Sequence, residues 1–89
     1  MDTVKLSKMD FEDLLIYAQR YSIGRMTYAP HTVCGIITEH LNVLSKNALT
    51  VIKRDIELQQ KQGNLGSPTI DEPIWLSTLA QIKDRLQEP

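Results

Sequence analysis

The sequence predicts an all-α fold, a compact four-helix bundle-like domain with short connectors. Apolar residues recur at spacings of three and four along four separate segments, which is the period of a helix buried on one side. Glycine or proline residues separate these segments, at Gly24, Pro30, Gly63, Pro68 and Pro73. A chain of 89 residues has room for one core, so residues 1–89 are expected to form one domain with antiparallel neighbouring helices.

The first helix is expected over Lys8–Tyr21. Ser7 is its predicted N-cap, and Asp10 places a carboxylate in the first turn, where the helix dipole is positive. The predicted buried face holds Phe11, Leu14, Leu15, Ala18 and Tyr21 or Ser22. The other side is expected to carry Glu12, Asp13, Gln19 and Arg20. Gly24 suits the left-handed residue that ends such a helix.

The second helix is expected over Pro30–Val43, because proline is favoured in a first turn. Its predicted apolar stripe is Val33, Ile36, Ile37, His40, Leu41 and Leu44. Three consecutive β-branched residues at 36–38 favour a strand locally, but the helical spacing continues on both sides of them. Gly35 lies inside this helix, where it is disfavoured, and we expect it to let another backbone come close.

The third helix is expected over Lys46–Gln62, with Ser45 as its N-cap. Its predicted buried face is Leu49, Ile52 and Ile56, with Gln59 as a further candidate. The segment 63–68 is the longest connector and the segment expected to be most mobile. The last helix opens at Pro73, with Asp71 and Glu72 as capping candidates. Its predicted face is Trp75, Leu76, Leu79, Ile82 and Leu86.

Composition limits the classes of protein to consider. The formal net charge is −1, which disfavours a strongly basic nucleic-acid binder and a polybasic membrane anchor. The single cysteine, Cys34, cannot form an internal disulfide. The N-terminus lacks the layout of a signal peptide, and no apolar run approaches the roughly 20 residues of a membrane span. A cytoplasmic protein is therefore expected.

Metal binding and catalysis have weak support. His31 and Cys34 share a helix face at a spacing of three, but a structural zinc site needs four ligands and no second pair is present. Cys34 with His31 or His40 has the residue types of a nucleophile and its base. A thiol inside a helix is poorly placed to be activated, however, so Cys34 is expected to be a packing residue. We expect no enzyme activity and no cofactor.

The segment 21–30 concentrates the residues best suited to binding. An arginine between two helices, flanked by tyrosines, can pair with a carboxylate or phosphate, and the helix that follows offers its N-terminal N–H groups to an anion. The candidate binding residues here are Tyr21, Arg25, Thr27, Tyr28 and His31. They would form a pocket for a phosphate-bearing small molecule.

A structural interpretation of the same residues stays open. Arg25 would then form an internal ion pair with Asp55, which follows Arg54 on the third helix. Arg54 and Asp55 adjoin the apolar stripe, so each is a candidate either for a buried pair or for a binding site. Trp75 also has two interpretations, because a single tryptophan either anchors a core or forms an interface hot spot. The run 74–76 cannot face one core entirely.

The chain resembles a group of small phage and prophage proteins. The resemblance is carried by Tyr21, the run Gly24-Arg25-Met26-Thr27-Tyr28, the pair Arg54-Asp55 and the segment Pro73-Ile74-Trp75-Leu76. It covers the chain from about Phe11 to Leu79, and the sequence departs from it in Pro68 and in the polar stretch 59–62. No activity is attached to this group, so the resemblance implies phage origin and fold rather than mechanism.

Small phage proteins without catalytic motifs often act by binding, which is an analogy and not a property of a site. We therefore expect a non-catalytic accessory protein of the host cytoplasm that inhibits a bacterial host protein or defence complex and self-associates as a homo-oligomer. The alternative is a binder that sequesters a cyclic or linear nucleotide through Arg25 and Tyr28. Weak nucleic-acid binding through the lysines and arginine of the third helix is the least favoured hypothesis, because acids share that helix.

Overall fold

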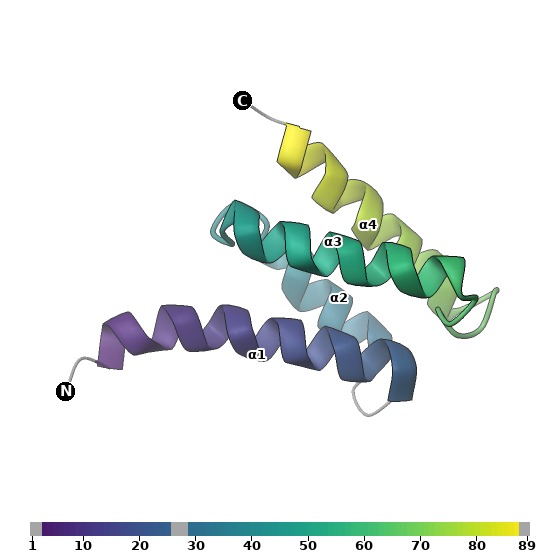
Figure 1. Ribbon diagram of the computed structural model, residues 1–89, viewed down its shortest axis with the longest axis horizontal. Helices are drawn as coiled ribbons and strands as arrows, with labels where there is room; N and C mark the ends of the chain where they lie inside the picture. The colour runs from purple at the N-terminus through teal and green to yellow at the C-terminus, as the bar shows by residue number, and fades with distance from the viewer. Residues whose placement is uncertain (1–2, 26–28, 88–89) are drawn as a thin grey trace.

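The computed structural model describes the backbone of residues 3–25 and 29–87, and the side chains of residues 11–23 and 29–87. These residues form four α-helices, shown in Figure 1: α1 (Thr3–Arg25), α2 (Pro30–Glu39), α3 (Lys46–Lys61) and α4 (Asp71–Gln87). No strand is present among the described residues, and the predicted all-α, bundle-like fold is confirmed.

The order of the helices in space differs from their order in the chain. Helix α1 packs against α2 and α3, and α4 packs against the same two helices. Among the described residues, α2 and α3 are therefore diagonal partners, as are α1 and α4 (Figure 1). The prediction that neighbouring helices pack as antiparallel pairs fails for α2 and α3, because these two helices make no contact with each other among the described residues.

Helix α1 is longer than predicted. It starts at Thr3 and ends at Arg25, so Ser7 is a helical residue instead of an N-cap, and Gly24 lies in the last turn instead of ending the helix. Good helix formers such as Lys5 and Lys8 precede and follow Ser7, and a single glycine costs a helix only about 1 kcal/mol. Neither signal is therefore strong enough to set the helix boundary.

The buried face of α1 is also rotated relative to the prediction. Leu15, Ser22 and Ile23 are buried as part of the face toward α2 and α3, and Gln19 joins them with no exposed surface. Leu14, predicted to be buried, is 65% exposed. One residue corresponds to about 100° around a helix, so this face is displaced by roughly one position.

Helix α2 ends four residues earlier than predicted. Glu39 is its last residue, and His40 caps it by donating its backbone N–H to the carbonyl of Ile37. The imidazole of His40 lies 4.9 Å from the ring of Phe11, between ring centroids, and its Nδ1 is 2.7 Å from the carbonyl oxygen of Ile36. These contacts end α2, and the chain then turns toward α3.

The start of α3 is as predicted. Ser45 Oγ accepts a hydrogen bond from the backbone N–H of Ala48 at 3.1 Å, which satisfies one of the unpaired donors of the first turn. The Glu12 carboxylate in turn accepts hydrogen bonds from the Ser45 backbone N–H and Oγ, at 2.7 and 3.1 Å. Glu12 thereby fixes the middle of α1 to the beginning of α3.

The connector from α3 to α4 is anchored in the core. Gly63 and Gly66 both have positive φ angles, 72° and 90°. A Cβ at Gly66 would lie 2.9 Å from the Asp71 side chain, so only glycine fits there. Leu65 between them is buried. Helix α4 then begins at Asp71, two residues before the predicted Pro73, with its first N–H groups bonded to the carbonyl of Ser67.

The core lies between all four helices. Its largest buried side chain is Trp75, which is 1% exposed. Buried aliphatic residues surround it from α2, α3, the connector and α4, namely Ile37, Leu49, Ile52, Ile56, Leu65, Leu79 and Ile82. The predicted faces of α3 and α4 agree with this core, except that Thr78 is buried and Leu76 and Leu86 are only partly so. None of the described helices is long and apolar enough to cross a membrane.

Candidate functional site

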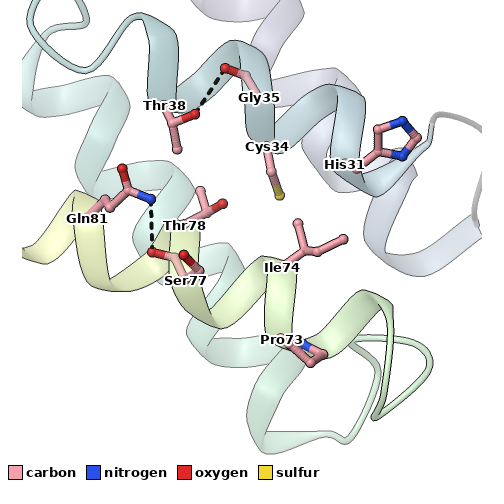
Figure 2. A pocket seen from close by; sticks show the side chains of 9 residues that line it. All are labelled: His31, Cys34, Gly35, Thr38, Pro73, Ile74, Ser77, Thr78 and Gln81. Atoms are coloured by element: carbon pink, nitrogen blue, oxygen red, sulfur yellow. Dashed lines mark hydrogen bonds between the residues drawn. The ribbon is translucent and has the colours of Figure 1, made fainter.

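An open cleft of about 370 Å³ runs between α2 and α4 (Figure 2). Helix α2 lines it with residues at positions 31, 34, 35 and 38, which fall on one side of a helix. Helix α4 lines the opposite wall with residues spaced in the same way. The residues that shape the rim and floor are His31, Gly35, Thr38, Ile74, Ser77 and Gln81.

Gly35 leaves the floor of this cleft open. We expected the glycine to let another backbone approach, but a Cβ built at Gly35 would meet nothing within 4 Å. That expectation is wrong, because α4 faces Gly35 across the cleft and does not pack into it. Its carbonyl accepts a hydrogen bond from Thr38 Oγ1 at 3.1 Å, which holds the Thr38 hydroxyl against α2 (Figure 2). The absence of a side chain at position 35 therefore creates space.

Cys34 lies below the cleft and faces α4 (Figure 2). Burial raises the pKa of the Cys34 thiol to about 11, an effect that a hydrogen bond with the Thr78 side chain partly offsets. A thiol in this state is a poor nucleophile at neutral pH, because only the thiolate attacks. The expectation that Cys34 is a packing residue agrees with this environment.

The thiol of Cys34 is expected to resist thiol–disulfide exchange in the native protein. With a pKa of about 11, roughly one thiol in a thousand is ionised at pH 8. Stopped-flow reaction with a chromogenic disulfide should therefore be slow at pH 8 and accelerate between about pH 9 and 11, whereas urea-unfolded protein should react at once. Native reaction at the unfolded rate would show that the thiol is exposed.

The raised pKa of Cys34 also predicts that the free energy of unfolding falls as the pH rises from about 9 to about 11, because the thiol of the unfolded chain ionises first, near pH 9.

His31 is exposed at the start of α2 and forms one end of the cleft (Figure 2). It lies one turn before Cys34, as the sequence predicted, but the two side chains differ in environment because Cys34 is buried. In the part of the chain that the structure describes, no three His, Cys, Asp or Glu side chains are grouped to hold a metal ion. The groups that His31 and the cleft present are hydrogen-bond donors and acceptors.

The predicted anion pocket at 21–30 is described only at its edges. Tyr21 is partly buried on α1, and its ring lies 4.3 Å from that of Tyr17, between centroids. The side chain of Arg25 and the residues Thr27 and Tyr28 lie outside the described part of the chain. The nucleotide pocket therefore stays a prediction.

Asp55 is a structural acceptor on α3. Its Oδ2 accepts one hydrogen bond from Gln19 Nε2 and one from Arg20 Nε, both at 2.6 Å. The described partners of Asp55 are thus two consecutive residues of α1, where the sequence predicted Arg25. The packing of α1 on α3 places positions 19 and 20 opposite Asp55. Arg54, beside it, is exposed.

Trp75 lies in the core, which is the first of its two predicted interpretations. Its neighbours Ile74 and Leu76 are partly buried against the core, and Ile74 also lines the cleft. The side chains of residues 74–76 are therefore divided between the core and the cleft, because consecutive residues of an α-helix point about 100° apart. Trp75 itself is too buried to meet a partner in this conformation.

The polar residues of the cleft were not predicted from the sequence. Thr38, Ser77 and Gln81 fall outside the predicted apolar stripes and were not singled out as candidates. The one available signal was Gly35, an unfavourable residue in a helix.

Comparisons of the chain with protein-family models, with curated proteins and with solved structures found no match.

Proposed function

We propose that this chain is a non-catalytic phage accessory protein that binds and inhibits a bacterial host or defence-system protein. The observation that carries the proposal is the open α2–α4 cleft at Gly35. A protruding side chain of a partner protein can enter it, contact Ile74 on the wall and reach polar groups at the rim. Protein interfaces combine an apolar centre with a polar rim in this way.

The chemistry of the cleft favours binding over turnover. Its buried thiol is protonated at neutral pH, and its accessible side chains, such as His31 and Ser77, belong to residue types that donate and accept hydrogen bonds. Such groups can recognise a peptide segment without reacting with it. The bacterial host and the phage origin in the proposal rest on the resemblance described above.

A Gly35→Met variant is expected to abolish partner binding while the chain stays folded. The methionine side chain would occupy the cleft, and nothing lies within 4 Å of the new Cβ, so the backbone at position 35 has room for a side chain. Methionine also favours the helix over glycine by about 0.7 kcal/mol, so the variant should unfold at a higher temperature than wild type. The measurement is capture of proteins from bacterial lysate on immobilised wild type and variant, followed by an activity assay of the captured protein.

Gln60→Met is the matched control, since Gln60 is exposed on α3 away from the cleft. A host protein that binds wild type and Gln60→Met, is lost with Gly35→Met, and is inhibited by the wild-type chain would support the proposal. Equal capture by all three proteins would exclude the cleft as the binding site. Stabilisation by a nucleotide, about 2.7 kcal/mol at 100 times its dissociation constant, would instead favour the small-ligand alternative.

A further inference from the structure

The outward face of α1 carries an apolar and aromatic stripe. Leu14 is 65% exposed and Tyr17 is 50% exposed, and the ring of Tyr21 contacts that of Tyr17. Spacings of three and four place these residues on one side of the helix. Among the described residues, α1 packs only against α2 and α3, and in Figure 1 α1 runs along the lower edge of the domain with no helix below it. Leu14 and Tyr17 therefore present apolar surface that no described helix covers.

Two opposite charges border the stripe. Asp13 and Arg20 are both exposed and lie seven residues apart. Seven residues are about two helical turns, so the two side chains lie along the same edge of the stripe, one before and one after Tyr17 in the chain. Arg20 is held in place because its Nε donates to Asp55 Oδ2 at 2.6 Å, while its side chain remains 56% exposed. A guanidinium has N–H donors besides Nε, so Arg20 can donate hydrogen bonds to a second carboxylate.

We propose that a second copy of this chain covers the stripe, with two α1 helices packed antiparallel about a two-fold axis near Tyr17. Charge complementarity between the two copies favours this arrangement. The two-fold axis places Asp13 of each copy next to Arg20 of the other, so the same attraction forms twice. It also places Leu14 of each copy against Tyr21 of the other. In a parallel pair about a two-fold axis along the helices, the Asp13 and Arg20 edge of each copy would instead lie against the Leu14 and Tyr21 edge of the other, so neither charge would gain a partner.

The other exposed apolar residues lack this self-complementarity. Leu58 lies on α3 between cationic residues, Arg54 and Lys61, that would repel their own copies. Val43 and Ile70 are single exposed apolar residues, one in the connector after α2 and one in the connector after α3. The α1 surface is also independent of the proposed function, because α1 does not contact α4 among the described residues and the α2–α4 cleft stays open in the dimer.

The dimer is expected to be weak. One pair of helices buries less than the roughly 1,200 Å² of a standard interface, so a dissociation constant on the order of ten micromolar is expected. Sedimentation velocity from about 1 to about 500 µM should show a monomer–dimer equilibrium for wild type. Tyr17→Glu should weaken the dimer at least about tenfold, and Leu58→Glu, a matched change on α3, should leave it unchanged.

A charge-swap experiment tests the antiparallel geometry. In the Asp13→Lys homodimer, the introduced lysine of each copy faces Arg20 of the other copy, which should weaken the dimer about tenfold. Arg20→Glu should weaken it to the same extent, because the introduced glutamate faces Asp13 of the other copy. A mixture of the two variants restores an opposite pair at both contacts, because the introduced lysine meets the introduced glutamate and the remaining Arg20 meets the remaining Asp13. The mixture should therefore form a heterodimer with nearly the wild-type dissociation constant. In a parallel pair, by contrast, neither single variant should weaken the homodimer, because positions 13 and 20 would not face a charge on the other copy.

Circular dichroism of each variant separates loss of fold from loss of the dimer. Asp13→Lys disrupts no hydrogen bond among the described residues, so it decides the question even if Arg20→Glu unfolds after losing Asp55. A monomeric wild type at every concentration, or wild-type dimerisation by Asp13→Lys or Tyr17→Glu, would overturn the proposal. Mixing without recovery of the heterodimer would overturn the antiparallel arrangement. Loss of lysate capture by Gly35→Met would bear on the cleft alone.

Discussion

Replacing Trp75 with alanine is expected to remove most of the free energy of unfolding of this chain. Trp75 is the largest buried side chain and is 1% exposed, between buried aliphatic residues of α3 and α4. Truncating a buried tryptophan costs about 3–5 kcal/mol, through lost burial and the cavity that remains. Small domains have a free energy of unfolding near the low end of about 5–15 kcal/mol, so the loss approaches the whole stability.

Urea denaturation followed by far-ultraviolet circular dichroism measures this effect. Trp75→Phe is the control, because phenylalanine keeps a large apolar ring in the same site and should cost much less than alanine. A Trp75→Ala protein that keeps its helical signal and loses less than about 1 kcal/mol would contradict the assignment of Trp75 to the core. The binding interpretation of Trp75 would then regain support.

The sequence predicted the helices best where local signals and tertiary packing agree. Helix α3 has an N-cap serine, a regular apolar stripe and a glycine after its end, and its bounds agree with the prediction to within one residue. Helix α1 lacks such agreement. Its apolar residues mark out two overlapping stripes, one through Leu14 and one through Leu15, and periodicity alone cannot choose between them. The Gln19–Asp55 contact belongs to the second stripe.

The cleft could not be predicted, because it depends on which helices meet. Helix α4 faces α2 across the cleft because α2 and α3 lie diagonally in the bundle. The length of the connector between α2 and α3 does not reveal that arrangement. Gly35 is unfavourable in a helix for several reasons, of which an open surface is one. His31 was singled out for an anion pocket at 21–30, whereas the structure places it at the end of the cleft.

Asp55→Ala is expected to lower the free energy of unfolding by about 2–3 kcal/mol, which is more than a surface ion pair contributes. The reason is Gln19, whose amide is fully buried and donates Nε2 to Asp55 at 2.6 Å. Without Asp55 that donor has no acceptor. Gln19 Oε1 is already buried without a hydrogen-bond partner among the described residues, so the variant would leave both ends of the amide unsatisfied. Chemical denaturation of wild type and variant measures the difference.

A double-mutant cycle with Gln19→Leu separates the buried amide from the Arg20 ion pair. Leucine is close in size to glutamine and carries no polar atoms, so Gln19→Leu should be within about 1 kcal/mol of wild type. In that background Asp55→Ala loses only the Arg20 contact, whose side chains are 56% and 23% exposed, and should cost about 1 kcal/mol or less. The coupling energy should then be about 1–2 kcal/mol. An equal cost of Asp55→Ala in both backgrounds would instead assign the stabilisation to Arg20 alone.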